Sequence, residues 1–359
     1  MQNNDIWILV INAGSTSTKV AVYRGEEPIL QESLGHPAEE LGAFPDVWDQ
    51  YAYRKGKILD WLAAKGFSLD RLTVIASRGG TVKPIPGGIY LIEEEMLADM
   101  KSKVYGNHAT NVGSQIAFDL AAGLSIPAIT VDPPVTDEMI PLARYSGLPQ
   151  IERQSSFHAL SQKATARKLA AILGRPYEAL NLVVIHLGGG ISVGAHQLGR
   201  VIDVNNALDG DGPFSPERAG SLPTGALIAL CFSGRYTQSE MMRLICGRGG
   251  LVAYLGSTDV PEIEGRILAG DEKAREVLAA MGFQVAKEIG AAAAVLAGRV
   301  DAMAFTGNLA KSERLMDGIR DRVSFIAPVY VFAGENEMEA LAAAARRFIG
   351  SRESPRPYR

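Results

Sequence analysis

Two stretches of the chain, residues 8–23 (ILVINAGSTSTKVAVY) and 182–194 (LVVIHLGGGISVG), share one plan. In each stretch an apolar run leads into a turn of small residues, and a second apolar run follows. Aligning Gly14 with Gly188 gives an offset of 188 − 14 = 174 residues, about half of the chain. Such turns leave backbone N–H groups uncovered by bulky side chains, and clustered N–H groups hold phosphate oxygens. The repeat therefore predicts two related domains that grip one polyphosphate between them.

Composition is that of an ordinary globular protein, with 359 residues, 47% hydrophobic and 21% charged. A net charge of −4, from 36 basic and 40 acidic residues, predicts neither nucleic acid nor an anionic membrane as partner. No apolar run approaches the ~20 residues that span a bilayer, and residues 1–5 lack the basic region of a signal peptide. We therefore expect a cytoplasmic protein, in which Cys231 and Cys246 are buried, reduced thiols.

Strands alternate with helices along the chain, which predicts an α/β architecture. We expect a first domain over 1–150 and a second over 151–339, with a C-terminal helix (about 340–350) packing back on the first. The strands are predicted at 6–13, 18–24, 28–34, 73–77, 127–132, 182–187, 191–194, 200–205, 302–305 and 325–332. Helices are predicted at 47–65, 93–103, 111–123, 155–174, 284–299 and 337–349, and the Pro/Arg-rich tail 351–359 is expected to fray.

Both turns are candidate phosphate sites. In the first, Gly14 permits a tight turn, Ser15 and Ser17 can donate hydroxyls, and the Asn12 amide can touch a metal or a phosphate; a plain hairpin is the alternative. The second carries three consecutive glycines after His186, which cost backbone entropy and so favour close approach to a ligand, with a bulge as the alternative. Neither turn matches the P-loop or the dinucleotide pattern.

Two arginines and two histidines are further candidates. Arg78 follows an apolar strand and precedes two glycines, a position suited to a carboxylate or phosphate, although it could be a solvated surface residue. Arg218 lies in a long irregular loop, residues 209–220, with charges of both signs. His158 stands near a predicted helix start, where the helix dipole favours an anion. His108 is equally open to a structural or a functional role.

Taken in order, these segments resemble the acetate kinase/butyrate kinase family of the actin-like superfamily, and butyrate kinases most of all. The resemblance covers nearly the whole chain and is carried by residues 11–19, 77–80, 131–133, 156–160, 186–192, 211–218, 249–256, 305–308 and 334–341. It implies two duplicated actin-like (ribonuclease H-like) domains with a nucleotide cleft between them, and assembly into homo-oligomers.

The resemblance also implies an enzyme, a phosphotransferase that uses ATP and Mg²⁺ to convert a short-chain carboxylate reversibly into an acyl phosphate. The implied catalytic residues are Arg78, Asp132, His158 and Arg218, with Arg78, His108 and Arg218 also on the substrate. Asn12 and Glu337 are the implied Mg²⁺ residues. The implied nucleotide contacts are Asn12, Ser15, Ser17, Lys19, His186, Gly188, Gly189, Gly190, Thr306, Gly307 and Asn308.

Two positions depart from the family pattern. Acetate kinases carry asparagine in the middle of the second turn, where this chain has Gly189, as butyrate kinases do. The adenosine loop usually ends in two glycines, and here the second is Asn308, which tolerates positive φ. Butyrate is thus the expected substrate, with acetate, propionate or isobutyrate as alternatives and a non-catalytic nucleotide-binding protein as the competing class.

Overall fold

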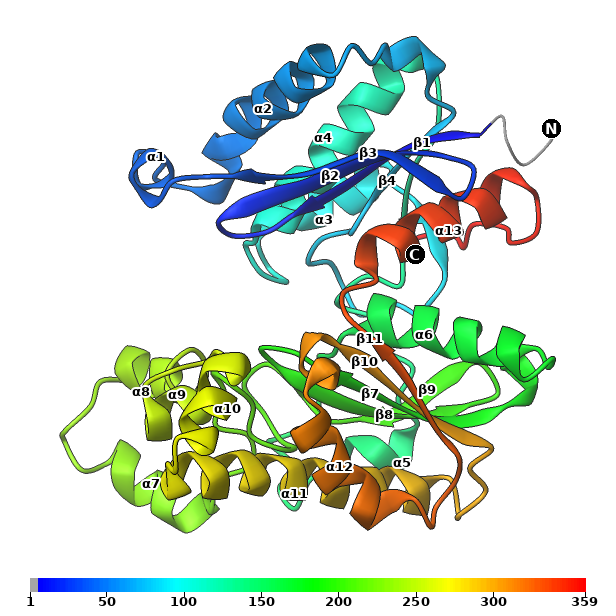
Figure 1. The fold of residues 1–359 in the computed structure, drawn as a ribbon. Helices are drawn as coiled ribbons and strands as arrows, with labels where there is room; N and C mark the ends of the chain where they lie inside the picture. The colour runs from blue at the N-terminus through cyan, green and yellow to red at the C-terminus, as the bar shows by residue number, and fades with distance from the viewer. Residues whose placement is uncertain (1–5) are drawn as a thin grey trace. The chain divides into compact units, whose positions relative to one another are not determined.

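The computed structural model describes residues 6–359, which fall into two compact units. Unit 1 combines the N-terminal residues up to Thr136 with Asn336–Arg359, and unit 2 is Asp137–Glu335. Each unit is a sheet with helices on both faces (Figure 1), so the predicted α/β class is confirmed. The segment 137–150, which we expected in the first domain, belongs to unit 2. Residues 1–5, where we expect no signal peptide, lie outside the described residues.

The sheet of unit 1 has six strands in the order β3-β2-β1-β4-β6-β5. They are β1 (Trp7–Ala13), β2 (Ser17–Arg24), β3 (Glu27–Gly35), β4 (Val74–Ser77), β5 (Ile89–Leu91) and β6 (Ala128–Val131). The first three form an antiparallel meander, and β4 and β6 continue the sheet in parallel with β1. Nearly all residues of β1 and β4 are buried, because helices cover both faces of these central strands.

Helices on the two faces of this sheet come from opposite ends of the chain (Figure 1). After the short α1 (Ala38–Gly42), α2 (Tyr51–Ala64), α3 (Glu94–Ser102) and α4 (Ala109–Leu124) lie on one side, and α13 (Glu337–Ile349) lies on the other. Helix α13 has the predicted bounds and packs on β1 and β4 through small residues such as Ala342 and Ala345, both fully buried.

The C-terminal tail packs on unit 1, so the expectation that it frays is wrong. The Tyr358 ring is buried, its hydroxyl donates to the Asp99 carboxylate, and Lys83 lies 4.3 Å from the ring centroid. The Arg356 amide donates to the Ile89 carbonyl at 2.7 Å. Burial of this one aromatic ring offsets the entropy cost of ordering a Pro/Arg-rich tail.

Unit 2 repeats the topology of unit 1, which confirms the predicted duplication. Its five-stranded sheet has the order β11-β10-β7-β8-β9, built from β7 (Asn181–Leu187), β8 (Ile191–Gln197), β9 (Arg200–Val204), β10 (Ala302–Gly307) and β11 (Val329–Ala333). The last paired residue before the turn is Ala13 in β1 and Leu187 in β7. These positions differ by 187 − 13 = 174 residues, the offset at which the sequences align.

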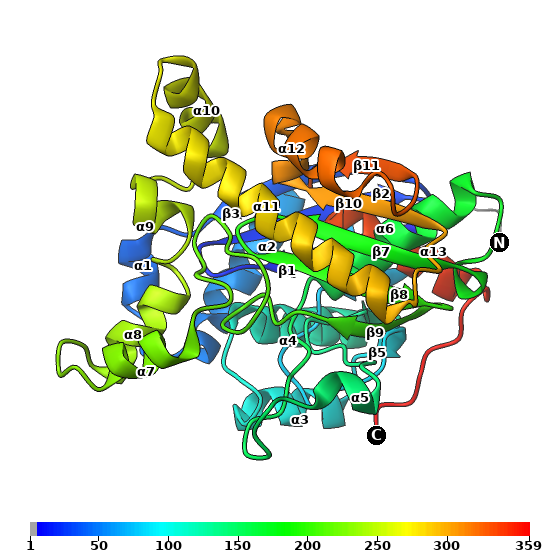
Figure 2. The same cartoon turned by 90° about the horizontal axis from the view of Figure 1, so that it is seen from below.

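On one face of this sheet lies α6 (Ala159–Ile172), and on the other lie α11 (Glu272–Val295) and α12 (Glu313–Val323) (Figures 1 and 2). Helix α11 begins 12 residues before the predicted start at 284, where the Asp271 carboxylate accepts a hydrogen bond from the Ala274 amide at 2.9 Å. Within residues 6–359, α11 is the one helix long and apolar enough to cross a bilayer by length and composition. Half of its most apolar stretch is buried, as is usual for a core helix.

Several elements of unit 2 were not predicted. They include α5 (Pro141–Arg144), α12 and four helices gathered at the N-terminal end of α11 (Figure 2), namely α7 (Thr224–Cys231), α8 (Gln238–Ile245), α9 (Leu251–Leu255) and α10 (Val260–Leu268). Helix α7 is apolar along its length, yet none of its residues is buried. Cys231 at its end is therefore exposed and Cys246 is half-buried, so the expectation of two buried thiols is wrong.

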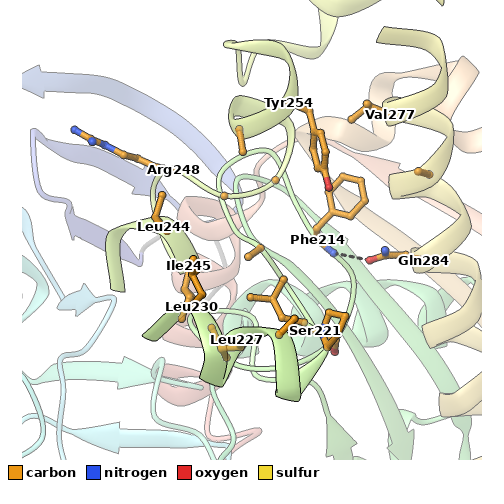
Figure 3. A pocket seen from close by; sticks show the side chains of 18 of the residues that line it. Phe214, Ser221, Leu227, Leu230, Leu244, Ile245, Arg248, Tyr254, Val277 and Gln284 are labelled. Carbon is orange, nitrogen blue, oxygen red and sulfur yellow. Dashed lines mark hydrogen bonds between the residues drawn. The ribbon is translucent and has the colours of Figure 1, made fainter. Parts of the chain in front are cut away.

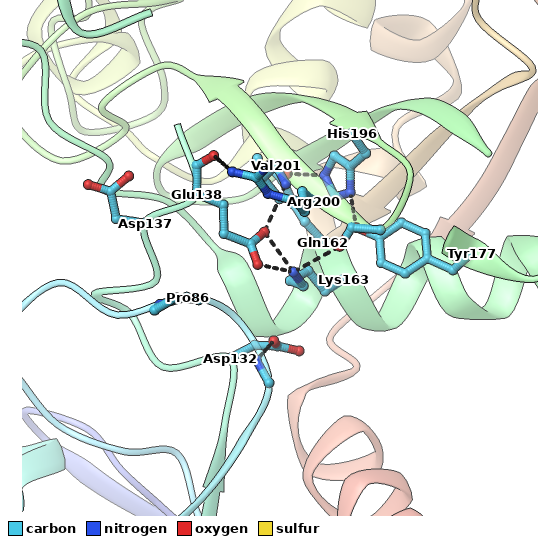
Figure 4. A network of polar contacts seen from close by, with 12 residues as sticks. Pro86, Asp132, Asp137, Glu138, Gln162, Lys163, Tyr177, His196, Arg200 and Val201 are labelled. Carbon is cyan, nitrogen blue, oxygen red and sulfur yellow. Dashed lines mark hydrogen bonds and ion pairs between the residues drawn. The ribbon is translucent and has the colours of Figure 1, made fainter. Parts of the chain in front are cut away.

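A buried ion pair joins α6 to the segment before α5 and to β9 (Figure 4). The Lys163 ammonium donates to both carboxylate oxygens of Glu138, at 2.9 and 2.8 Å, and to the Gly199 carbonyl at 3.2 Å. The Val201 amide donates to the same carboxylate at 2.8 Å. Both side chains are at most 4% exposed. Each charge therefore depends on the other for solvation inside unit 2.

We expect Lys163→Met to lower the free energy of unfolding of unit 2 by about 3–5 kcal/mol, because it leaves the buried Glu138 carboxylate without the charge of Lys163. Hydrogen exchange at the α6 amides as a function of urea measures this change. The double variant Glu138→Gln/Lys163→Met should recover part of the loss. Lys273→Met, which breaks an exposed pair with Glu276, is the matched control and should leave the exchange unchanged. Equal effects of Lys163→Met and the control would contradict this reading.

Candidate functional site

The first turn (residues 14–17) joins β1 to β2 and is held by a buried arginine from α2. The Gly14 amide donates to the Ser17 carbonyl at 2.8 Å. The fully buried Arg54 guanidinium donates to the carbonyls of Gly14 and Ser15, each at 3.0 Å, and to the Thr18 hydroxyl at 3.1 Å. These contacts fix the shape of the turn by binding its carbonyl oxygens. Sequence reasoning missed Arg54, although it lies within the buried stripe of α2 with Ile58 and Trp61.

In unit 1 the Glu337 carboxylate contacts the side chains of both Asn12 and Arg78. The Asn12 side-chain amide donates to Glu337 Oε2 at 2.8 Å, and Arg78 Nη2 lies 3.1 Å from Glu337 Oε1. Glu337 is the first residue of α13, and Arg78 follows β4, where its amide donates to the Ile11 carbonyl at 3.1 Å. Arg78 Nε is buried without a hydrogen-bond partner among residues 6–359. One donor of this guanidinium is therefore available to an anion.

His108 and Asp132 also belong to unit 1. His108 caps α4, and its Nε2 lies 3.5 Å from the Ser15 hydroxyl. Burial lowers the pKa of His108, and the charges of Arg78 and Arg54 lower it further, which favours the neutral ring. The buried Asp132 carboxylate accepts a hydrogen bond from the Gly88 amide at 2.8 Å, and its backbone has a positive φ of 41°. A buried aspartate in this sparsely populated conformation is typical of functional sites.

In unit 2 two histidines stack at the carboxyl end of β7. His158 caps α6 at its N-terminus, and its ring lies 3.8 Å from that of His186 with an interplanar angle of 12°. His158 Nδ1 is 2.9 Å from the Ser192 hydroxyl, and His186 Nδ1 is 3.0 Å from the Ser161 hydroxyl. His186 also pairs in register with Thr306 of β10. Ligands of α/β sheets bind beyond such carboxyl strand ends.

The second turn (residues 188–190) is pressed against Arg218. The Gly188 amide donates to the Gly190 carbonyl at 3.1 Å, which closes the turn, and the Ser215 hydroxyl donates to the Gly189 carbonyl at 2.5 Å. A Cβ on Gly190 would lie 1.9 Å from Arg218 Nη1, so any larger residue there would displace the Arg218 guanidinium. Arg218 Nη1 donates to the Ala207 carbonyl, and its Nε is buried without a partner in the described chain.

The adenosine loop of the family resemblance falls at the end of β10. The Thr306 hydroxyl is buried and has no hydrogen-bond partner among the residues that the structure describes. Gly307 has a φ of +92°, and a Cβ there would lie 2.2 Å from the Leu187 carbonyl oxygen. Asn308 does not adopt the positive φ that asparagine tolerates, because it begins a 3-10 helix (Asn308–Lys311) directly after Gly307. The Asn308 amide donates to the Glu335 carboxylate at 3.3 Å.

An apolar pocket of about 620 Å³ adjoins the arginine loop (residues 209–220) in unit 2 (Figure 3). Phe214 lines it from this loop, Ser221 directly follows the loop, and Leu227 and Ile245 line the pocket from α7 and α8. The Phe214 amide donates to the Gln284 side-chain oxygen at 3.1 Å, which ties the loop to α11. Most of its lining is apolar, with charged side chains from Arg248, Lys273 and Glu276 among the lining residues.

The candidate residues thus form one group in each unit. Unit 1 holds Asn12, Ser15, Ser17, Lys19, Arg78, His108, Asp132 and Glu337, and unit 2 holds His158, His186, Gly188, Gly189, Gly190, Arg218, Thr306, Gly307 and Asn308. Within residues 6–359 no cluster of three or more histidine, cysteine, aspartate or glutamate side chains could hold a metal. Any ion at Asn12 and Glu337 would have one carboxylate and one amide from the protein, and water or phosphate would complete its shell.

Sequence reasoning also missed Ser192 and His196. Ser192 contacts His158 directly, and His196 is fully buried nearby in β8. The available signal was the alternation Ser192–Gly194–His196 along a strand whose other face is apolar.

A family model and several solved structures match this chain. A model of the acetokinase family matches residues 140–355, more than half of the chain. The crystal structure of Porphyromonas gingivalis acetate kinase matches with a TM-score of 0.79 and 19% identity, covering 96% of this chain and 99% of that one. A propionate kinase from Francisella tularensis subsp. tularensis SCHU S4 matches at 0.70 and 18%, covering 94% and 98%.

Acetate kinase from Entamoeba histolytica matches with a TM-score of 0.74 and 15% identity, covering 96% of this chain and 100% of that one. At these identities the likeness shows the fold, which is the two-domain actin-like ATPase fold. The family match over residues 140–355 adds the sequence relationship: this chain belongs to the acetokinase family.

Proposed function

We propose that this protein transfers the γ-phosphoryl group of ATP reversibly to a short-chain carboxylate, and that butyrate is the acid it uses best. Membership of the acetokinase family supports a phosphotransferase with a carboxyl acceptor. Gly189, in the middle of the second turn, favours butyrate over acetate. Acetate, propionate and isobutyrate are the alternative acids, and a nucleotide-binding protein without catalysis is the competing class.

The observation that carries the proposal is the Arg218 side chain beside the glycine turn. Its Nε is buried without a partner in the described chain, and its Nη1 would touch any Cβ on Gly190. A buried donor without an acceptor costs about 1–3 kcal/mol, so such an atom calls for an anion. A planar guanidinium matches the oxygens of a phosphoryl group and spreads its charge over them. A scaffold without catalysis would have no use for Arg78, Asp132, His158 and Arg218 together.

The chemistry needs positioning and charge neutralisation more than acid–base catalysis. A carboxylate is already ionised at neutral pH. One of its oxygens attacks the γ-phosphorus, the bond from that phosphorus to the bridging oxygen breaks, and ADP leaves with the electron pair. Arg78 and Arg218 neutralise the phosphoryl oxygens, and His158 donates a hydrogen bond to them. Asp132 orients these groups, and His108 contacts the acid.

Nucleotide contacts are divided between the two turns in this proposal. Asn12, Ser15, Ser17 and Lys19 serve the transferred phosphoryl group, and His186, Gly188, Gly189, Gly190, Thr306, Gly307 and Asn308 serve the nucleotide. When bound, Mg²⁺ would neutralise the charge of the nucleotide phosphates and orient their oxygens. Asn12 and Glu337 fit this ion, because Mg²⁺ keeps several waters and needs only one or two protein oxygens.

We also propose that a second copy of the chain covers the apolar surface at α7. From Ser221 to Gly234 this surface carries no charged residue, so it can face its own copy without like-charge repulsion. A helix apolar on all sides is normally buried. The exposed side chains are Leu222 (42%), Ile228 (53%), Phe232 (87%), Tyr236 (38%), Met242 (44%) and Tyr254 (62%). Leu222, Ile228 and Phe232 lie within the uncharged segment, and they are the exposed apolar groups that a second copy would cover there.

The compartment we propose is the cytoplasm. Cys231 and Cys246 are unpaired, and Cys231 is exposed on α7. Free exposed thiols persist in reducing compartments, where ATP is also available.

Hydroxamate trapping of acyl phosphate tests the reaction. With ATP and Mg²⁺, a series of acetate, propionate, butyrate, isobutyrate and valerate should give product, with the highest kcat/KM for butyrate. Because one methylene in an apolar pocket is worth ~1–3 kcal/mol, neighbouring linear acids should differ by roughly tenfold or more. Absence of acyl phosphate from every acid would contradict the kinase proposal, and a maximum at another acid would contradict butyrate alone.

Arg218→Ala should lower kcat by about 10³-fold, the scale of a transition-state arginine in phosphoryl transfer. The Kd for ATP, measured by calorimetry, should change far less. Arg275→Ala is the matched control, because Arg275 is an exposed residue of α11 paired with Glu272 in the same unit. It should leave kcat unchanged. A wild-type kcat in Arg218→Ala would remove Arg218 from the mechanism.

Sedimentation velocity tests the second copy. The wild-type chain should sediment as a dimer or a multiple of dimers. Phe232→Glu should lower the sedimentation coefficient toward that of a smaller species, because a charge buried at the interface without a partner opposes association. Phe325→Glu is the control, since Phe325 is 84% exposed elsewhere in unit 2. A wild-type monomer, or the same size for Phe232→Glu and wild type, would contradict the proposed interface.

A further inference from the structure

A continuous line of buried polar groups connects His158 to the interior of unit 2. Ser192, Gly194 and His196 alternate along β8 and share one face of the sheet. Facing them, α6 presents Ser161 and Gln162, three and four residues after His158. Ser192, Gln162 and His196 are all fully buried. Apolar side chains would be at least as stable in this position, so a satisfied polar line calls for a function.

The contacts of this line are short and continuous. His158 Nδ1 lies 2.9 Å from the Ser192 hydroxyl, which accepts a hydrogen bond from Gln162 Nε2 at 2.8 Å. Gln162 Oε1 lies 2.9 Å from His196 Nε2, and His196 Nδ1 lies 2.8 Å from the Tyr177 hydroxyl. Figure 4 shows the inner part of this line, with Gln162 between His196 and the Lys163 pair.

The direction of each hydrogen bond follows from one backbone carbonyl. Gln162 Nε2 also donates to the Ser192 carbonyl at 3.1 Å, and a carbonyl can only accept, so the orientation of the amide is fixed. Gln162 Oε1 must then accept, and His196 Nε2 must carry a proton. Burial lowers the pKa of His196 well below its ordinary value, so the ring is neutral and its Nδ1 accepts from Tyr177.

The Ser192 hydroxyl lies between Gln162 and His158. Its oxygen accepts from Gln162, and its proton can be donated to His158 Nδ1, 2.9 Å away. With that donation His158 Nδ1 is the acceptor, and in the neutral ring the proton is on Nε2. All donors in the line point the same way, an arrangement in which each hydrogen bond strengthens the next.

Gly194 provides an independent observation. It lies inside β8, where glycine weakens a strand and marks a close approach. A Cβ on Gly194 would lie 2.4 Å from Gln162 Oε1 and 3.0 Å from His196 Nε2. The strand therefore lacks a side chain where the Gln162–His196 hydrogen bond needs the space.

We propose that Ser192, Gln162 and His196 are positioning residues that hold His158 in the tautomer with its proton on Nε2. Resting on the proposed function, this tautomer supplies the N–H that donates to the phosphoryl oxygen during transfer. His186, which stacks on His158, holds the ring plane but makes its own contact with Ser161. The roles of the two histidines are therefore separate.

Nitrogen-15 NMR of the histidine rings tests the tautomer without any turnover. In the full chain labelled at its five histidines, His158→Gln assigns the His158 signals by their loss. We expect a protonated Nε2 and an unprotonated Nδ1 for His158 in the wild type. Ser192→Ala should shift both signals toward the average of the two tautomers, and Ser192→Thr, which keeps the hydroxyl, should restore them. A protonated Nδ1 in the neutral wild-type ring, or an unchanged spectrum in Ser192→Ala, would overturn the proposal.

Kinetics supply the second readout. Ser192→Ala should lower kcat roughly three- to tenfold, the loss of one oriented hydrogen bond, with little change in KM for ATP or acid. Gly194→Ala should act in the same direction by displacing Gln162, and it serves if Ser192→Ala fails to fold. Ser114→Ala, another fully buried serine but in unit 1, is the control and should change neither readout.

These outcomes separate the two proposals. If the wild type forms no acyl phosphate from any acid, the proposed function fails, while the spectra still decide the tautomer. An altered His158 spectrum in Ser192→Ala with an unchanged kcat would overturn the catalytic consequence of the positioning.

Discussion

Around the second turn, the backbone at several glycines lies so close to neighbouring groups that a residue with a Cβ would clash with them. A Cβ would lie 1.9 Å from Arg218 at Gly190, 2.8 Å from the His186 ring at Gly188, and 2.2 Å from the Leu187 carbonyl at Gly307. A methyl group at any of these positions would move a candidate functional residue or β7 itself. These glycines cost conformational entropy on folding. In return, they allow the histidine pair, the arginine and the end of β10 to lie close together.

The two faces of β8 have different roles: one packs in the apolar core of unit 2, and the other forms hydrogen bonds. Ile191, Val193 and Ala195 join the apolar core shared with α11, which supplies the driving force for folding. Ser192 and His196 face α6 and form hydrogen bonds instead of apolar contacts, and Gly194 between them leaves room for these bonds. Such a satisfied polar layer adds little net stability, but it fixes side-chain orientation, which an apolar layer cannot do for an imidazole.

The duplicated units have the same topology and different local chemistry. In unit 1 a buried arginine from a helix, Arg54, binds the carbonyls of the turn, and burial together with this arginine lowers the pKa of neighbouring His36 to about 4. In unit 2 the turn is instead closed by its own glycines and contacted by Arg218 from a loop. The hairpin is thus a common scaffold, and the residues that reach it from elsewhere in each unit decide what it can bind.

The sequence by itself determined the paired hairpins, their offset of 174 residues, the alternation of strands and helices, and the bounds of α13. These features depend on apolar periodicity, glycines and helix-forming residues within a short window, so a local pattern reveals them. The positions of Arg78, His158, Arg218 and the glycine turns also followed from motifs that lie at strand and helix ends.

Only the tertiary structure decided which distant side chains meet. Arg54 lies 40 residues from Gly14 and His196 lies 34 from Gln162, so no local pattern joins either pair. The exposure of α7 and the burial of Tyr358 were likewise hidden, because composition gives the polarity of a segment but not what covers it. Local periodicity sets where an element forms, whereas long-range packing sets which of its polar groups are buried and therefore what they must bond.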